Sequence, residues 1–91
     1  MTSGPYRLAL AATAERALAR LPEAVAAAIV ELMVGPLVDA PRRVGHPLHR
    51  ELAGLWSARR GSYRIVYEID DTAKEVRVVR IDHRADVYRA R

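Results

Sequence analysis

The sequence has no cysteine and no phenylalanine, and only one of its 15 basic residues is a lysine. Without cysteine the chain can form neither a disulfide nor a thiolate metal site, as is typical of a protein in a reducing cytoplasm. No segment approaches the roughly 20 apolar residues that span a membrane, and residues 1–7 lack the pattern of a secretory signal. We therefore expect a cytoplasmic protein that does not enter a membrane, folded as one domain over residues 1–91.

The charge of the chain, which is +4 in total, is distributed unevenly. Residues 1–41 contain three basic and four acidic residues, whereas residues 42–91 contain twelve basic and seven acidic ones. A GC-rich genome also enriches arginine, but it does not determine where the arginines fall. Because the planar guanidinium group suits phosphate and stacks on bases, we expect the C-terminal half to bind nucleic acid, with RNA favoured as the ligand.

The hydrophobic pattern of the first half predicts a strand and two helices. Residues 6–10 alternate between polar and apolar and indicate a strand. Thr13 could N-cap a helix that runs to Arg20, and Pro22 suits the first turn of a second helix. Gly35 and Pro36 should end or kink that second helix, although Leu37 and Val38 could prolong it by a turn. Residues 41–47 are expected to form a loop.

The second half changes to the two-residue period of strands. Strands are predicted at residues 54–60, 62–69 and 75–81, with a hairpin turn at 70–74. The expected fold is α+β, in the order β-α-α-β-β-β, with an N-terminal strand and an α-helical hairpin packed on a small antiparallel sheet. The helices should cover one face of the sheet and leave the arginine-rich face open.

Several arginines are expected to meet on that open face. Arg59, Arg60 and Arg64 flank the Gly61-Ser62 turn, and Arg84 and Tyr88 follow the last strand. Converging guanidinium groups provide the positive field that a phosphate needs in its charge-dense transition state. The alternative is a set of ordinary surface arginines that pair with Glu68, Asp82 or Asp86.

The three histidines, His46, His49 and His83, also lie in the second half. An imidazole could take a proton from a ribose 2′-hydroxyl or return one to a leaving oxygen, although each could equally be a plain surface residue. We expect no metal site, because there is no HExxH motif and His46 and His49 lack a third ligand. Templates for serine catalysis and glycine-rich phosphate loops are absent.

The aromatic residues fall into two groups. Tyr63 and Tyr67 alternate with isoleucines and are expected in the core, and Trp56 is expected to be packed as well. Tyr88 lies in a polar terminal segment, where it could stack on a base or bind a phosphate.

Four segments of the sequence resemble the conserved parts of a known family. Residues 45–48 (GHPL) and 51–67 (ELAGLWSARRGSYRIVY) are similar to its central signature, and residues 78–88 (VVRIDHRADVY) to its C-terminal strand and tail. Residues 14–22 (AERALARLP) fit its first helix. The most specific parts are residues 61–64 and the segment from His83 to Tyr88. Together these segments resemble the RelE/ParE toxin superfamily.

The resemblance implies a RelE-like toxin of a type II toxin–antitoxin system. Such toxins enter the A site of the 70S ribosome and cut mRNA by attack of a 2′-hydroxyl on the adjacent phosphate, without metal or cofactor. By position, Arg64 would hold the scissile phosphate, Arg84 would stabilise the transition state or leaving group, and Tyr88 would stack on the substrate. Further substrate contacts are expected from Arg59, Arg60, His46, His49 and Ser57.

One departure concerns the proton-transfer group. RelE-type toxins often carry lysines on the strand where this chain has Ser57 and Arg59, and arginine is a poor base because it stays protonated. The acid–base role would then fall to a histidine, as in YoeB-like members, which use a histidine and a glutamate. We favour His83, because it adjoins Arg84 in the sequence, over His46 and His49.

Two other functions remain open at this stage. One is a ParE-like toxin that binds DNA gyrase without nuclease activity, and the other is a degenerate member that only binds its antitoxin or represses DNA. Retention of Arg64, His83, Arg84 and Tyr88 favours the nuclease. The expected partner is a small acidic antitoxin that covers the basic face or displaces the C-terminal tail. Operator DNA would be bound only through the antitoxin complex.

Overall fold

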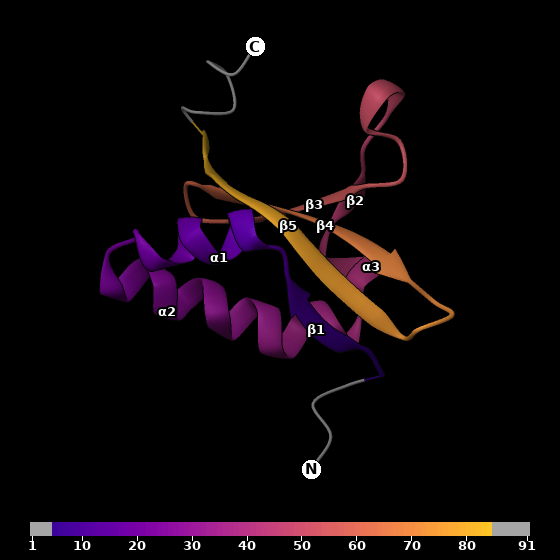
Figure 1. The fold of residues 1–91 in the computed structure, drawn as a ribbon, viewed down its shortest axis with the longest axis horizontal. Coiled ribbons are helices and arrows are strands. Elements are labelled where there is room, and N and C mark those ends of the chain that lie inside the picture. The colour runs from indigo at the N-terminus through magenta and orange to yellow at the C-terminus, as the bar shows by residue number, and fades with distance from the viewer. Residues whose placement is uncertain (1–4, 85–91) are drawn as a thin grey trace.

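The computed structural model describes residues 5–84, in which helices and strands follow the predicted α+β pattern (Figure 1). The elements are β1 (Arg7–Leu10), α1 (Ala12–Ala19), α2 (Glu23–Leu32), a π-helix η1 (Met33–Leu37), α3 (Pro41–Val44), β2 (His46–Pro47), a 3-10 helix η2 (Arg50–Leu52), β3 (Trp56–Arg60), β4 (Tyr63–Asp70) and β5 (Glu75–His83). Within this range no helix is both long and apolar enough to cross a membrane.

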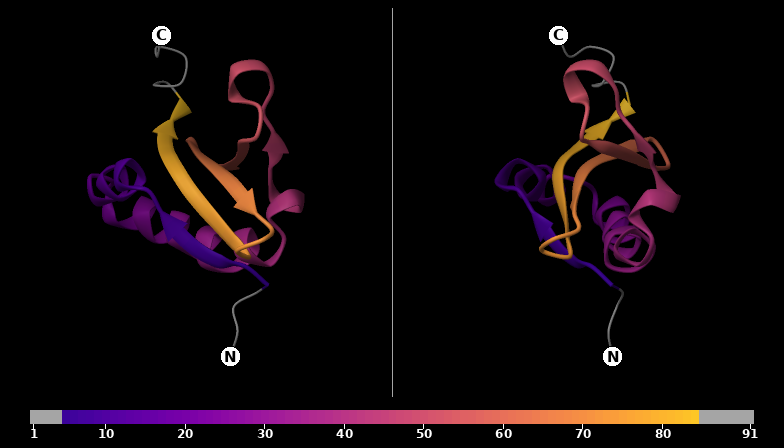
Figure 2. Two further views of the ribbon diagram at one scale, coloured as in Figure 1. Left: turned by 45° about the vertical axis from the view of Figure 1, so that its right-hand side comes forward. Right: turned by 90° about the vertical axis from the view of Figure 1, so that its right-hand side faces the viewer.

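The strands form one five-stranded sheet in the order β1-β5-β4-β3-β2. The predicted meander of β3, β4 and β5 is confirmed, because each of these strands pairs antiparallel with the next. β1 lies parallel to β5 at one edge, and the helical segments provide the crossover that a parallel pair requires. β2 pairs antiparallel with β3, so the segment from β2 through η2 lies at the opposite edge from β1 (Figure 2).

Helices α1 and α2 cover one face of the sheet and build the core with it (Figure 1). Ile65 and Tyr67 of β4 are fully buried there, with Tyr63 and Ile69 packed against the same cluster, as the alternation predicts. Burial of these apolar side chains is the main source of stability for so small a domain.

β5 contains an irregularity that the simple alternation did not predict. Val66 pairs with Arg80 and Tyr67 pairs with Val78, so Val79 is an extra residue in β5. Such a bulge shifts the phase of the following side chains by one residue. Val76 and Val78 face the core before it and Ile81 faces the core after it, which leaves Arg80 and Asp82 on the open face.

Two local predictions are corrected by the structure, and the alternative of a longer second helix is confirmed. α1 begins at Ala12 with Ala11 at the N-cap, and the Thr13 hydroxyl instead donates to the Val79 carbonyl over 2.9 Å. At Gly35 and Pro36 the chain forms the π-helix η1, in which the missing N–H and the proline ring are more easily accommodated, and it stays helical beyond Leu37 and Val38, as the alternative of an extra turn predicts. The expected loop at 41–47 contains α3 and β2.

Tyr67 fixes the chain where it passes from α3 to β2. Its buried hydroxyl donates to the Pro41 carbonyl over 2.6 Å, and burial raises the pKa of Tyr67 to about 12. Gly45 packs against this hydroxyl, and a Cβ at Gly45 would lie 2.6 Å from the Ser57 carbonyl oxygen. The absence of a side chain at Gly45 therefore allows β2 to approach β3.

A second cluster joins three distant parts of the chain. Arg42 of α3 binds Asp71 in the β4–β5 turn over 2.7 Å, and the Tyr6 hydroxyl donates to Asp71 over 2.6 Å. The bond from Arg42, followed by that from Tyr6, lowers the pKa of Asp71 from 3.8 to about 2. These exposed contacts tie the start of β1 and α3 to the hairpin turn.

Replacing Tyr67 with phenylalanine should destabilise the domain by roughly 1–3 kcal/mol, because a buried carbonyl loses its donor. Tyr63→Phe is the matched control, since the Tyr63 hydroxyl has no hydrogen-bond partner among residues 5–84. Urea unfolding followed by circular dichroism measures both variants. Equal stabilities of the two variants would contradict the role given to the bond between Tyr67 and Pro41.

The Asp71 cluster predicts a pH-dependent contribution to stability. Because the pKa of Asp71 is lowered on folding, its contribution is complete above about pH 4–5 and is lost as the pH falls towards 2. Asp71→Asn should therefore melt below the wild type near pH 6, and the two melting temperatures should converge near pH 2. A difference that stays constant over this range in thermal melts would exclude the ion pair as its cause.

Candidate anion-binding site

Three arginines converge at the end of the sheet where β3 turns into β4. Arg59 and Arg64 are directly opposed on these two strands. Gly61 forms the turn between the strands with a φ of 61°, a conformation that favours glycine. Arg84 follows β5 and is fixed beside the turn, because its backbone N–H donates to the Ser62 carbonyl over 2.8 Å.

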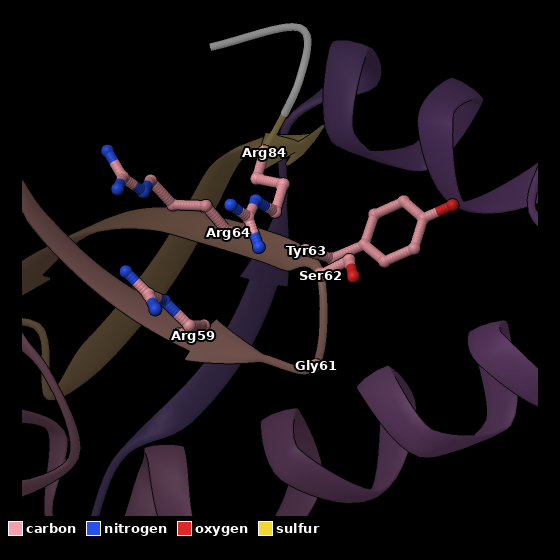
Figure 3. Close-up of a pocket in the computed structure, with 6 residues that line it drawn as sticks. All are labelled: Arg59, Gly61, Ser62, Tyr63, Arg64 and Arg84. Carbon is pink, nitrogen blue, oxygen red and sulfur yellow. The ribbon is translucent and has the colours of Figure 1, made fainter. Parts of the chain in front are cut away.

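The three side chains border a small hollow of about 110 Å³. It is lined by Arg59, Gly61, Ser62, Tyr63, Arg64 and Arg84 (Figure 3). Figure 3 shows the guanidinium groups of Arg59, Arg64 and Arg84 on one side of β4, with the Tyr63 ring pointing the other way, towards the helices. The hollow is therefore positively charged and belongs to the open face of the sheet.

The arginines of this hollow have no carboxylate partner among residues 5–84, which sets them apart from their neighbours. On the same face, Arg77 pairs with Glu68 over 3.5 Å and Arg80 pairs with Asp82 over 2.8 Å. The two acidic residues that could have neutralised the hollow are thus bound to other arginines. Asp86, the third candidate, lies outside the described residues.

The direct opposition of Arg59 and Arg64 carries an electrostatic cost. Like charges opposite each other on neighbouring strands repel and destabilise the pair. An anion bound between them would remove that cost and form charge-assisted hydrogen bonds with both groups. The geometry therefore fits an anion with several acceptor oxygens, such as a phosphate.

Two further predicted residues share the open face but not the hollow. Ser57 lies two residues before Arg59 in β3 and is buried. His46 of β2 is exposed and lies opposite Ser57, so its side chain is on the same face as Arg59 and diagonal to it.

The remaining predicted residues lie elsewhere. Arg60 pairs with Tyr63 and lines a separate, mainly apolar groove beside the start of α2. His49 is exposed, just before η2. Tyr88, a predicted catalytic residue, lies outside the described residues.

His83 does not lie beside the arginine hollow, contrary to the expectation from its sequence position next to Arg84. It is opposite Tyr63, and the two rings meet edge to face with centroids 5.1 Å apart. His83 shares the helix side of the sheet with Tyr63, its cross-strand partner. Arg64 follows Tyr63 in β4 and faces the open side, because neighbouring residues in a strand point to opposite faces. The sheet therefore separates His83 from the arginine hollow, although His83 is adjacent to Arg84 in the sequence.

The pairing of Arg80 with Asp82 over 2.8 Å was not predicted from the sequence. Strict alternation from Val76 would have placed Arg80 on the core side, and only the bulge at Val79 reverses this. No signal in the sequence identified the bulge. Within residues 5–84 no group of three or more His, Asp or Glu side chains could hold a metal ion.

Comparison with known proteins identifies the family. Residues 6–88 match the family described as the ParE toxin of the type II toxin–antitoxin system parDE. Toxin RelG of Mycobacterium tuberculosis is 53% identical over 85 residues, which cover 93% of this chain and 98% of that toxin. Toxin RelE of the same organism is also 53% identical, over 93% of this chain and 88% of that toxin.

Solved structures agree with the sequence matches. The toxin–antitoxin complex RelBE2 from M. tuberculosis has a TM-score of 0.84 and 51% identity, over 88% of this chain and 99% of the matched chain. The intact Escherichia coli RelBE complex shares the fold, with a TM-score of 0.71 at 21% identity, over 86% of this chain and 95% of the matched one. The chain therefore belongs to the RelE/ParE superfamily of toxins from type II toxin–antitoxin systems.

Proposed function

We propose that this toxin is an endoribonuclease that cuts mRNA in the ribosomal A site and so inhibits translation. The observation that carries the proposal is the hollow at Arg59, Arg64 and Arg84, where three guanidinium groups have no carboxylate partner among the described residues. The similarity to proteins named RelE and RelG supports the same class of activity.

The proposed reaction is a transesterification that needs no external nucleophile. The ribose 2′-oxygen loses its proton and attacks the adjacent phosphorus, and the bond from phosphorus to the 5′-oxygen then breaks. The products are a 2′,3′-cyclic phosphate and a 5′-hydroxyl that has received a proton. Between these states the phosphorane carries extra negative charge, which preorganised donors stabilise more strongly than they stabilise the substrate.

The arginines have distinct positions for this reaction. Arg64 and Arg59 approach the anion from adjacent strands, and Arg64 is proposed to hold the non-bridging oxygens of the scissile phosphate. Arg84 enters from the end of β5 and is proposed to stabilise the transition state or the leaving oxygen. None of the three can act as a base, because a guanidinium group stays protonated.

His46 becomes the proposed proton-transfer residue. Of the three histidines it is the one that cross-strand pairing places on the face of Arg59 and Arg64. A diagonal neighbour in a sheet lies roughly 7–8 Å away, so a ribose bound between His46 and Arg59 could be reached by both. His83 faces the helices, and Tyr88 is retained as a proposed stacking residue on the family resemblance alone.

The proposed partners follow from the same surface. Related structures are toxin–antitoxin complexes, which supports a cognate antitoxin here. We propose that this antitoxin is acidic and covers the basic open face in the cytoplasm. The 70S ribosome and mRNA would compete for that face, and operator DNA would be bound only through the antitoxin complex.

A second candidate function is the poisoning of DNA gyrase without nuclease activity. It is favoured by the match of residues 6–88 to the ParE toxin family. A gyrase-binding protein has no chemical need for unpaired guanidinium groups around one hollow, which is why the nuclease is preferred. The two functions give different products in the cell, namely cut messages or broken DNA.

Induction of the toxin without its antitoxin should arrest translation and produce mRNA cuts that primer extension maps within translated codons. Arg64→Ala and Arg84→Ala should each lower cleavage by roughly a hundredfold, the usual effect of removing one donor to a developing oxyanion. Arg77→Gln is the control, since it removes an arginine that already has a partner on the same face. Intact mRNA together with gyrase-linked DNA breaks would reject the nuclease.

The two histidines can be compared directly in a purified ribosome assay. His46→Gln should slow single-turnover cleavage by roughly a hundredfold or more, whereas His83→Gln should keep most of the activity, because general acid–base catalysis contributes about 10²–10⁴ in rate. Thermal melts of both variants control for folding. The reverse order of effects would return the proton-transfer role to His83.

A further inference from the structure

Asp82 occupies an unexpected position for an acidic residue in this site. It is the direct cross-strand neighbour of Arg64, so the two side chains emerge on the same face of the sheet. Opposite charges in such a pair normally bind each other. A carboxylate bound to Arg64 would compete with a phosphate for the same guanidinium group.

The structure shows that Asp82 binds a different arginine. Its carboxylate lies 2.8 Å from the guanidinium of Arg80, two residues earlier in the same strand, and the Asp82 side chain is only 21% exposed. Arg64 forms no ion pair with any described residue, although Asp82 is its nearest acidic neighbour in the sheet register. The Asp82 side chain thus emerges beside Arg64, but its carboxylate is bound to Arg80.

The bulge in β5 makes this arrangement possible. Arg80 and Asp82 are two residues apart and share a face, and the extra residue Val79 places both of them on the open face, opposite Val66 and Arg64. Without the bulge, strict alternation from Val76 and Val78 would turn both Arg80 and Asp82 towards the core. The bulge therefore supplies both the aspartate and the arginine that neutralises it.

We propose that Arg80 is a positioning residue that holds Asp82 away from Arg64 and so keeps Arg64 available for phosphate. This inference rests on the proposed function, since it assigns Arg64 to the scissile phosphate. Arg80 acts through Asp82 and touches no substrate. Its removal would release the carboxylate onto Arg64, which would then be bound internally.

The alternative role for Arg80 is a direct contact with an RNA phosphate, because it is half exposed on the same face. The two roles differ in what a second mutation does. If Arg80 contacts RNA, its loss cannot be repaired at Asp82. If Arg80 only restrains Asp82, neutralising Asp82 should make Arg80 dispensable.

The test compares the wild type with Arg80→Gln, Asp82→Asn and the double variant in ribosome-dependent cleavage at fixed ionic strength. Arg80→Gln should lower the rate by roughly tenfold or more, the effect of losing one charge-assisted hydrogen bond to phosphate. Asp82→Asn should cleave at least as fast as the wild type. The double variant has the net charge of the wild type and should recover to within roughly threefold of it.

Arg77→Gln provides the matched control. It removes one positive charge from the same face and strand and frees Glu68, but Glu68 lies opposite Arg77 rather than opposite Arg64. Its rate should stay close to that of the wild type, which separates a local effect from a change in net charge. A double variant as slow as Arg80→Gln, or an Arg80→Gln protein as fast as the wild type, would overturn the proposal.

A crystal structure of Arg80→Gln gives a readout that does not depend on RNA. We expect the Asp82 carboxylate within 4 Å of the Arg64 guanidinium, where the wild type has no such pair. If this contact forms in the Arg80→Gln variant but the wild-type toxin does not cut mRNA, the nuclease function is wrong and the positioning role stands. If Asp82 and Arg64 stay apart in the Arg80→Gln variant while the wild-type toxin does cut mRNA, the positioning role is wrong and the nuclease function stands.

Discussion

The pairing of β4 with β5 is the constraint on which the rest of this structure depends. It carries the core through Ile65 and Tyr67 on one face and the charged residues through Arg64 on the other. Because a strand has only two faces, the burial of every second residue determines which side chains remain for function. The extra residue Val79 then changes that assignment for the last part of β5, so that core packing and site chemistry are set by one register.

The edge of the sheet depends on the same core. Tyr67 leaves β4 on the helix side, reaches the Pro41 carbonyl and is bordered by Gly45, so the chain enters β2 close to β3. That approach gives the pairing of His46 with Ser57 and puts an imidazole on the arginine face. A buried hydrogen bond on one side of the sheet thereby helps to position a candidate functional residue on the other.

The sequence was most informative where a long, regular pattern repeats. β3, β4 and β5 were predicted to within two residues at each end, because alternation over several residues is a strong signal of a half-buried strand. The two-residue β2 was missed, since its pairing depends on the distant strand β3 and on close packing at Gly45. Whether the second helix ends at Pro36 or continues through Leu37 was left open, because propensity favours an end there. Packing of the buried Met33 and Leu37 keeps the chain helical, in the π-helical form of η1 that was not predicted.

For the site, composition predicted a basic face, and the family resemblance assigned roles to Arg64 and Arg84. Two facts were inaccessible from the residues alone. His83 lies behind the sheet because a strand turns adjacent side chains to opposite faces, and the sequence order of His83 and Arg84 conceals this. The ion pair between Arg80 and Asp82 lies on the face of Arg64 because of the bulge at Val79, which no pattern in the sequence signals.

The distribution of ion pairs on the open face explains how so small a domain can hold three guanidinium groups that have no carboxylate partner among residues 5–84. Arg77 and Arg80 are neutralised by carboxylates, which limits the repulsion to the end of the sheet. There the groups are partly exposed, so water and salt screen them and the cost to stability stays modest. In a more buried position the same groups would need permanent partners and could not exchange them for a substrate. A site at the sheet margin, where the hairpin turn and the end of β5 meet, combines fixed backbone positions with arginine side chains that no carboxylate of residues 5–84 neutralises, as the proposed anion binding requires.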